Sequence, residues 1–81
     1  MDKRISVVSI ILESQDAFAE VNALLHEYRE WIVARMGVPY RERGVSIISV
    51  VFDAPPDVTS ALSGKLGMLK SVTSKTVTTK V

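Results

Sequence analysis

The sequence predicts an α+β domain of four strands and two helices in the order βαββαβ. Two strongly apolar segments rich in β-branched residues, 4–12 and 45–53, have the composition of central strands. Each precedes a segment with apolar residues at helical spacing, 15–29 and 57–67. Right-handed crossovers then give a four-stranded antiparallel sheet in the order 4-1-3-2, with both helices on one face. This is the ferredoxin-like arrangement, in a single domain over residues 1–81.

The first strand and the first helix are separated by a polar cluster. Ser14 is a favoured N-cap residue, and Asp16 places a negative charge in the first turn, where the helix dipole stabilises it. The apolar face of helix 15–29 is formed by Ala17, Val21, Leu24, Leu25 and Tyr28. His26 falls on the opposite face, so we interpret it as a solvated surface histidine.

A hairpin with a long loop is expected next. Strand 30–36 and strand 45–53 are joined by the glycine- and proline-containing loop 37–44. In the third strand, as in the first, both faces are apolar.

The last third of the chain predicts a helix and an edge strand. Pro55 and Pro56 end the third strand and open the helix, where a missing N–H costs little, and Gly67 is a candidate C-cap. Segment 71–80 alternates weakly and carries hydroxyl side chains and two lysines, which is typical of an exposed edge strand.

Composition excludes several kinds of site. The chain has 81 residues, a net charge of +1, no cysteine and a single histidine. Disulfides, thiolate zinc sites and iron–sulfur clusters therefore cannot form, and one imidazole does not make a histidine metal cluster. No apolar run approaches the roughly 20 residues of a membrane span. We expect a small cytoplasmic domain that has no cofactor and no metal site and does not enter a membrane.

Charge is distributed unevenly along the chain. Residues 58–81 hold four lysines and no acid, whereas all nine acids lie in residues 1–57. The lysines either protect an edge strand from unwanted pairing or form a surface for anions or nucleic acid. Their spacing of five residues, without interleaved aromatics, favours the first interpretation.

The two central strands are apolar on both faces. One set of side chains alternates with another in each strand: Ile5, Val7 and Ile11 with Val8, Ile10 and Leu12, and Val45, Ile47 and Val51 with Ile48, Val50 and Phe52. The helices cover only one face, and an exposed apolar sheet is unusual for a soluble monomer. We therefore expect a homo-oligomer, a dimer or a tetramer, assembled through the sheet.

Two segments have residues beyond what the fold needs. The run Arg35–Gly44, RMGVPYRERG, holds three arginines, whose planar forks of donors suit carboxylate or phosphate, and one tyrosine. It is either a binding segment or a solvated loop. Gly64-Lys65-Leu66-Gly67 is not a phosphate-binding P-loop, but Gly64 inside a helix indicates close approach of another backbone or a helix that is ending.

The predicted topology brings three connections to one end of the sheet. These are the turn 13–15, the loop 37–44 and the turn 67–71. The N-terminus of the first helix lies at this end and favours an anion, while the end of the second helix opposes it. An anionic small-molecule site at this end is one hypothesis, and pairing of the arginines with acids of a neighbouring subunit is the other.

The run RMGVPYRERG followed by ALSGKLG resembles the iron-only hydrogenase system regulators, and the likeness extends from Ile5 to beyond Val72. That family is similar in fold to ACT domains and to the sensor domain of nickel-responsive repressors. The resemblance implies a cytoplasmic regulatory or accessory protein of [FeFe]-hydrogenase metabolism. Its motif positions are Arg35, Met36, Gly37, Pro39, Tyr40, Arg41, Gly44, Gly64, Lys65 and Gly67, to which the residues themselves add Arg43. The chain lacks the histidines and cysteine of the nickel site and a DNA-reading element.

These observations favour a non-enzymatic, oligomeric regulatory or ligand-sensing module with a small anionic ligand or a regulatory protein partner. The alternative is a nucleic-acid-binding ferredoxin-like protein, although direct DNA binding is not expected. RNA-binding sheets display aromatics on their open face, whereas here only Phe52 of the central strands is aromatic. No catalytic residues are identified, since no paired buried carboxylates or activated nucleophile is visible.

Overall fold

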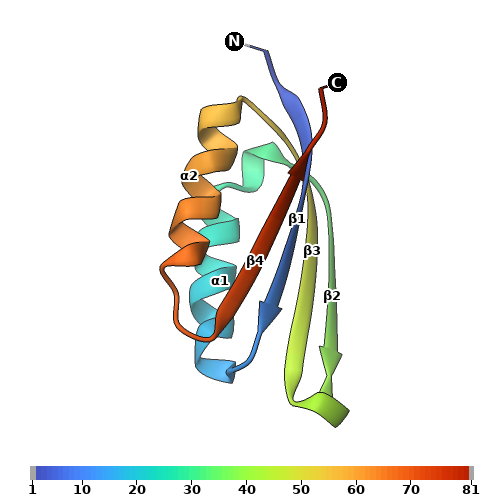
Figure 1. The fold of residues 1–81 in the computed structure, drawn as a ribbon, viewed down its shortest axis with the longest axis vertical. Helices are drawn as coiled ribbons and strands as arrows, with labels where there is room; N and C mark the ends of the chain where they lie inside the picture. The colour runs from blue at the N-terminus through green and yellow to red at the C-terminus, as the bar shows by residue number, and fades with distance from the viewer. Residues whose placement is uncertain (1, 81) are drawn as a thin grey trace.

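The computed structural model describes residues 2–80 and follows the predicted order of elements (Figure 1). The elements are β1 (Arg4–Leu12), α1 (Gln15–Glu27), β2 (Ile32–Tyr40), β3 (Val45–Ala54), α2 (Pro56–Gly67) and β4 (Val72–Thr78). Short 3-10 turns at Arg29–Trp31 and Arg41–Arg43 lie on either side of β2.

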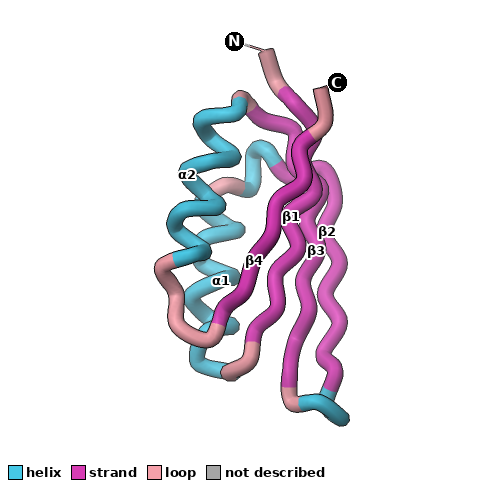
Figure 2. The backbone as a smooth tube through the Cα atoms, in the orientation of Figure 1, coloured by secondary structure: helices cyan, strands magenta, loops and turns pink. Residues whose placement is uncertain are grey.

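The strands form one antiparallel sheet in the order β2-β3-β1-β4. This is the predicted order 4-1-3-2 read from the other edge, with β1 and β3 in the centre. Both helices lie on one side of the sheet, and the other side carries no element among the described residues (Figure 2). The α+β prediction, with four antiparallel strands and two helices, is confirmed.

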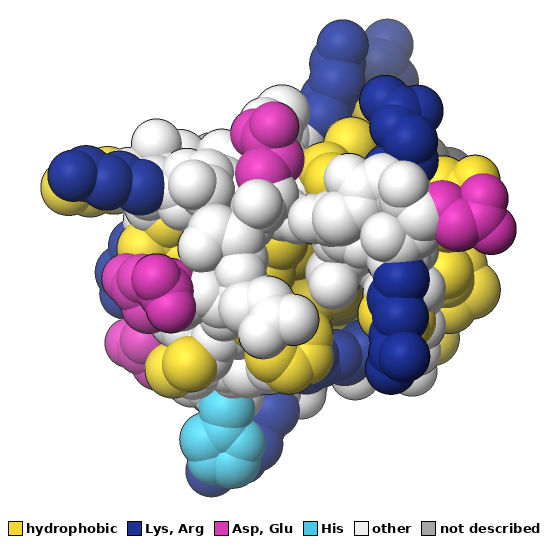
Figure 3. Space-filling model, turned by 90° about the horizontal axis from the view of Figure 1, so that it is seen from below, with side chains coloured by type: hydrophobic (Ala, Val, Ile, Leu, Met, Phe, Trp, Pro, Cys, Tyr) yellow, Lys and Arg dark blue, Asp and Glu magenta, His cyan; other side chains and the backbone are white. Residues whose placement is uncertain are grey.

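Helix α1 begins as its sequence predicts and ends two residues early. The Ser14 hydroxyl accepts a hydrogen bond from the Asp16 amide at 3.1 Å, which caps the first turn. Tyr28 leaves the helical region and packs half-buried on the core, with its ring centroid 6.3 Å from that of Phe52. His26 is exposed, as expected, and its cyan side chain projects from the surface in Figure 3.

The expected strand 30–36 and loop 37–44 are wrong in their boundaries. Gly37–Tyr40 belong to β2 and pair with Val45–Ile48, so the turn is only Arg41–Gly44. Glycine and proline are tolerated here because β2 is an edge strand, where an N–H on the outer side has no ladder partner to lose. Gly44 closes the hairpin with a left-handed backbone, φ 66°, and donates its N–H to the Arg41 carbonyl at 3.1 Å.

The second half of the chain needs five smaller corrections. Helix α2 begins one residue early, at Pro56, and β3 extends to Ala54. Gly67 is the last helical residue and not the C-cap, which is Met68. Ser71 has a positive φ of 61°, so β4 starts only at Val72 and is shorter than the expected 71–80. At Gly64 a Cβ would meet nothing within 4 Å among the described residues, so the close backbone approach, one of the two alternatives for this position, is absent, and α2 ends three residues later at Gly67.

The core lies between the helices and one face of the central strands. From Ser6 in β1 and from Ile48 in β3, every second residue points into it and is at most 2% exposed: Ser6, Val8, Ile10, Leu12, Ile48, Val50, Phe52 and Ala54. Helices α1 and α2 contribute Ala17, Val21, Leu25, Leu62 and Leu66. The predicted division of the central strands into two alternating sets is confirmed.

Three connections meet at one end of the molecule, as the topology predicts. In Figure 1 the β1–α1, β2–β3 and α2–β4 connections all lie at the lower end of the drawing. Two of them are joined by a hydrogen bond from the Glu13 amide to the Ser71 carbonyl at 2.8 Å. Seen from this end, basic side chains stand on several sides of the surface (Figure 3).

Candidate functional site

A groove runs between α1 and the helix-facing side of β2, and we call it the α1–β2 groove. It consists of two adjoining cavities of about 460 and 420 Å³, which share Gln15, Phe18, Pro39 and Ser46 in their lining. The first cavity adds Arg35, Gly37 and Ile48, and the second adds Ser14, Arg41 and Gly44. The groove exists because α1 buries its apolar residues over the core and leaves the edge strand β2 uncovered on that side.

The floor of the groove is open because of a glycine. Alternation along β2 turns Arg35, Gly37 and Pro39 toward the helices, opposite Val50, Ile48 and Ser46 of β3. A Cβ placed on Gly37 would meet no described atom within 4 Å. The space above Gly37 is therefore open, while Ile48 beside it on β3 stays buried, at 1% exposure.

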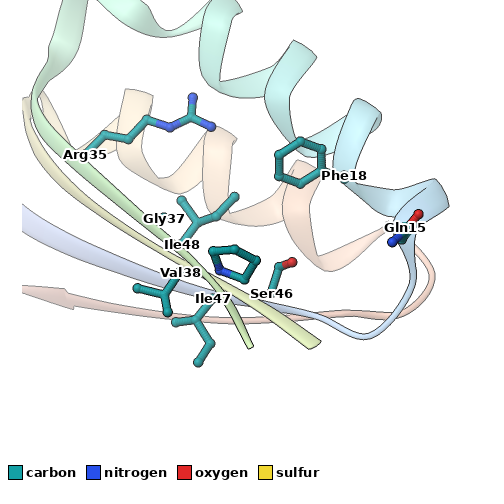
Figure 4. A pocket seen from close by; sticks show the side chains of 9 residues that line it. Gln15, Phe18, Arg35, Gly37, Val38, Ser46, Ile47 and Ile48 are labelled. Atoms are coloured by element: carbon teal, nitrogen blue, oxygen red, sulfur yellow. The ribbon is translucent and has the colours of Figure 1, made fainter. Parts of the chain in front are cut away.

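Two residues of α1 that are one helical turn apart lie on the groove side: Phe18 lines both cavities, and Asn22 contacts Arg35 of β2. Phe18 is 47% exposed, and the Arg35 guanidinium donates a hydrogen bond to Oδ1 of Asn22. Phe18 and Asn22 lie four residues apart and thus on one face of α1. In Figure 4, Arg35 extends from β2 over the groove and Phe18 stands opposite on the helix, while Val38 and Ile47 point to the other side of the sheet.

The groove is electrostatically positive. Its described lining contains two arginines, Arg35 and Arg41, and no aspartate or glutamate. The first turn of α1 opens into the second cavity through Ser14, although the charge of Asp16 in that turn opposes the helix dipole. An anionic group is thus the charge that this groove would stabilise.

The other face of the sheet is apolar and uncovered within the chain. We call it the open sheet face, and its large apolar side chains are between 37% and 62% exposed: Ile5, Val7, Ile11, Met36, Val38, Tyr40, Ile47 and Val77. One row, Val77–Val7–Val51–Ala34, crosses all four strands. Phe52 lies in the core instead, so Tyr40 is the aromatic side chain that the described part of this face presents.

The structure divides the sequence-predicted site residues among separate places. Arg35, Gly37, Pro39, Arg41 and Gly44 line the groove, whereas Met36 and Tyr40 belong to the open sheet face. Arg43 lies in the turn, outside the lining of both cavities. Gly64, Lys65 and Gly67 are on α2 and do not line the groove. A contiguous motif is split in this way because alternate residues of a strand face opposite sides.

Lys65 joins the two helices. Its Nζ lies 3.3 Å from Oε1 of Glu27 and 5.1 Å from the centroid of the Tyr28 ring. The Tyr28 hydroxyl, and next the Glu27 carboxylate, raise the pKa of Lys65 above its ordinary value. Both partners lie at the C-terminal end of α1, so Lys65 is held away from the end where the three connections meet.

Among the residues that line the groove, sequence reasoning missed Gln15 and Phe18 of α1, and it also missed Asn22, which accepts the hydrogen bond of Arg35. Phe18 could have been found as an aromatic residue of the first helix that lies outside its apolar stripe. Within residues 2–80, no three His, Cys, Asp or Glu side chains are grouped so as to hold a metal ion. Neither helix in that range has the length and hydropathy to cross a bilayer.

The family model of TM1266-like proteins, described as iron-only hydrogenase system regulators, matches residues 4–76. The chain belongs to this family. The family predicted from the RMGVPYRERG and ALSGKLG motifs is therefore confirmed, and both motifs lie within the matched range.

Two solved structures are similar to this TM1266-like chain. The structure of the uncharacterized protein TM1266 from Thermotoga maritima superimposes with a TM-score of 0.93 at 40% identity, covering 98% of this chain and all of that one. A formyltetrahydrofolate deformylase from Pseudomonas putida KT2440 gives a TM-score of 0.65 at 16% identity, covering 90% of this chain and 28% of the deformylase. The second likeness shows a shared fold alone. Among curated proteins, none matches the chain.

Proposed function

We propose that this chain is a ferredoxin-like, non-enzymatic regulator of the iron-only hydrogenase system that acts in the cytoplasm as a homo-oligomer. Family membership supports the regulatory role, and the strand order supports the fold assignment. The chain offers no reading helix for DNA among its described elements, so it acts on transcription or on enzyme maturation through a regulatory protein partner.

The open sheet face is the observation that supports the proposed homo-oligomer. Eight large apolar side chains gathered on one face form a patch that a soluble monomer rarely leaves in water. A second copy is the most economical cover, because two such sheets can pack face to face at about 10 Å with their side chains interdigitated. A two-fold axis brings the same patch of both copies together, so the apolar face of one copy meets the apolar face of the other.

The charges on the open sheet face are compatible with self-pairing. Lys75 of β4 lies opposite Ser9, and Asp53 of β3 lies opposite Ile5, so both charges point to this face. A face with charges of both signs can be arranged against its own copy without net repulsion, whereas a face of one sign cannot. The apolar row Val77–Val7–Val51–Ala34 lies between them.

Complementation in a host that carries an iron-only hydrogenase tests the function. We expect removal of the chain to change hydrogenase activity or transcript level, and the wild-type chain to restore it. Val7→Lys places a charge in the middle of the open sheet face and should fail to restore it, whereas Lys70→Gln, at an exposed position between α2 and β4, should succeed. Unchanged hydrogenase activity and transcript on removal would contradict the regulatory role.

A further inference from the structure

We propose that the α1–β2 groove binds a small organic anion with a flat or branched apolar body. The ligand carries an oxyanion, a carboxylate or a phosphate monoester, that pairs with Arg35, and its body packs on Phe18 and Pro39 above Gly37. The inference rests on the proposed regulatory function for its role in the cell, while binding itself is measured independently.

The groove has the size and surface of a small-molecule site. Its larger cavity, about 460 Å³, falls within the usual range of roughly 300–1,000 Å³ for such sites. Accessible apolar surface comes from the exposed rings of Phe18 on α1 and Pro39 on β2, while Ile48, the neighbour of Gly37 on β3, is buried and closes the floor. Ligand sites typically combine such apolar lining with a few placed polar groups.

In this groove, Arg35 is the polar group that is positioned to bind the ligand. Asn22 accepts from one of its terminal nitrogens and thereby holds the guanidinium over the groove. A guanidinium has five N–H donors in a fixed fork, so this contact leaves donors for a carboxylate or phosphate. Holding the arginine in place before binding reduces the entropy lost when a ligand binds.

Charge complementarity selects an anion as the occupant. Arg35 and Arg41 line the two halves of the groove, and none of its described lining residues is acidic. A neutral ligand would gain the apolar contacts alone, and a cation would be repelled. Arg35 and Arg41 are six positions apart along a nearly extended backbone, a span of about 20 Å, so a compact ligand is held by one of them. We assign Arg35, because Phe18 and Pro39 line both cavities but only the cavity of Arg35 has the open floor at Gly37.

Titration of the intact chain with three probes of one shape tests the ligand class. Phenylacetate carries a carboxylate, phenyl phosphate carries a phosphate ester and phenylacetamide carries no charge. We expect at least one of the two anions to bind in calorimetry, at least tenfold more tightly than the amide, and to shift the amide resonances of Phe18 and Gly37. The tighter anion identifies the oxyanion that the site prefers.

Two variants remove different parts of the site. Gly37→Leu fills the floor, where the structure leaves space and no positive φ is needed, so the variant should fold and lose binding. Arg35→Gln keeps a donor for Asn22 but removes the charge, and should weaken the anion at least tenfold while leaving the amide unchanged. Lys70→Gln removes one positive charge at the same end of the molecule, outside the groove, and should bind like the wild type.

Three results would overturn the proposal: no binding of either anion, equal affinity for the amide, or unchanged affinity in folded Gly37→Leu. None of them bears on the oligomer, because the groove lies on the helix side of the sheet and the open sheet face on the other. Ligand affinity therefore tests the proposed binding site, and the mass in solution tests the proposed assembly separately.

Discussion

Val7 and Val51 are cross-strand partners at the centre of the sheet, and both side chains face away from the helices. One residue along each strand, Val8 and Val50 are also partners, but they are at most 1% exposed in the core. Valine thus occupies both faces of the β1–β3 strand pair, but only Val7 and Val51 are accessible to another molecule.

This difference predicts opposite effects of the same substitution at neighbouring positions. Val8→Lys buries an ammonium group without a partner in the core, which costs more than a chain of this size can tolerate, so it should not fold. Val7→Lys should keep its secondary structure, because Val7 is 40% exposed within the chain. Circular dichroism with urea unfolding measures both. A cooperatively folded Val8→Lys would contradict the assigned register.

Substitution by alanine should have different effects at the two glycines of the β2–β3 hairpin, Gly44 and Gly37. Gly44 adopts φ 66°, so Gly44→Ala should destabilise the chain by about 1–2 kcal/mol through left-handed backbone strain. Gly37 has ordinary strand geometry and open space at its Cβ, so Gly37→Ala should be neutral or slightly stabilising. Urea unfolding gives both values, and equal effects would refute the hairpin geometry described for Arg41–Gly44.

Two buried hydroxyl groups lack hydrogen-bond partners among the described residues, and replacing one of them should stabilise the chain. Thr59 is 5% exposed, and within the described structure its Oγ1, like that of Thr76, has no hydrogen-bond partner. Thr59→Val replaces the hydroxyl by a methyl group of similar shape and helix propensity, so it should raise the free energy of unfolding by about 1 kcal/mol. Ser6→Ala is the opposite control, because Ser6 Oγ lies 2.8 Å from Thr78 Oγ1, and it should destabilise. A destabilised Thr59→Val would mean that the hydroxyl has a bound partner.

The contact of Lys65 with Tyr28 and Glu27 predicts a loss of stability at high pH. Its pKa is raised in the folded chain, so its stabilising contribution is complete below the ordinary value of 10.5 and is lost as the pH rises past the folded pKa. The difference in urea midpoint between wild type and Lys65→Met should stay constant from about pH 6 to pH 9 and shrink above about pH 11. Lys70→Met serves as the parallel control. A difference that grows with rising pH would contradict this contact.

The fold was predictable because its signals are local. β-branched runs marked β1 and β3, and the helical spacing of apolar residues marked α1 and α2, so the strand order followed from the handedness of the crossovers. The boundaries of β2 were not predictable in this way. Glycine and proline at Gly37 and Pro39 indicate a turn, and only the position of β2 at the sheet edge makes them compatible with a strand.

Only part of the groove could be predicted from the sequence. The arginine-rich segment drew attention to Arg35 and Arg41, but residues 37–44 were expected to form a loop, in which side chains do not alternate between two faces. Its other wall, Phe18 and Asn22, comes from a helix far away in the sequence, and their meeting with Arg35 depends on where α1 lies on the sheet. Residue pattern alone does not specify that placement.

The mass of the chain in solution tests the central claim, that a second copy covers the open sheet face. Sedimentation equilibrium or light scattering at micromolar concentration should give at least twice 8.9 kDa for the wild type. Val7→Lys, folded by circular dichroism, should fall to a single chain, while Lys70→Gln should keep the wild-type mass. A wild-type mass of 8.9 kDa, or a Val7→Lys variant that assembles as the wild type does, would contradict the account.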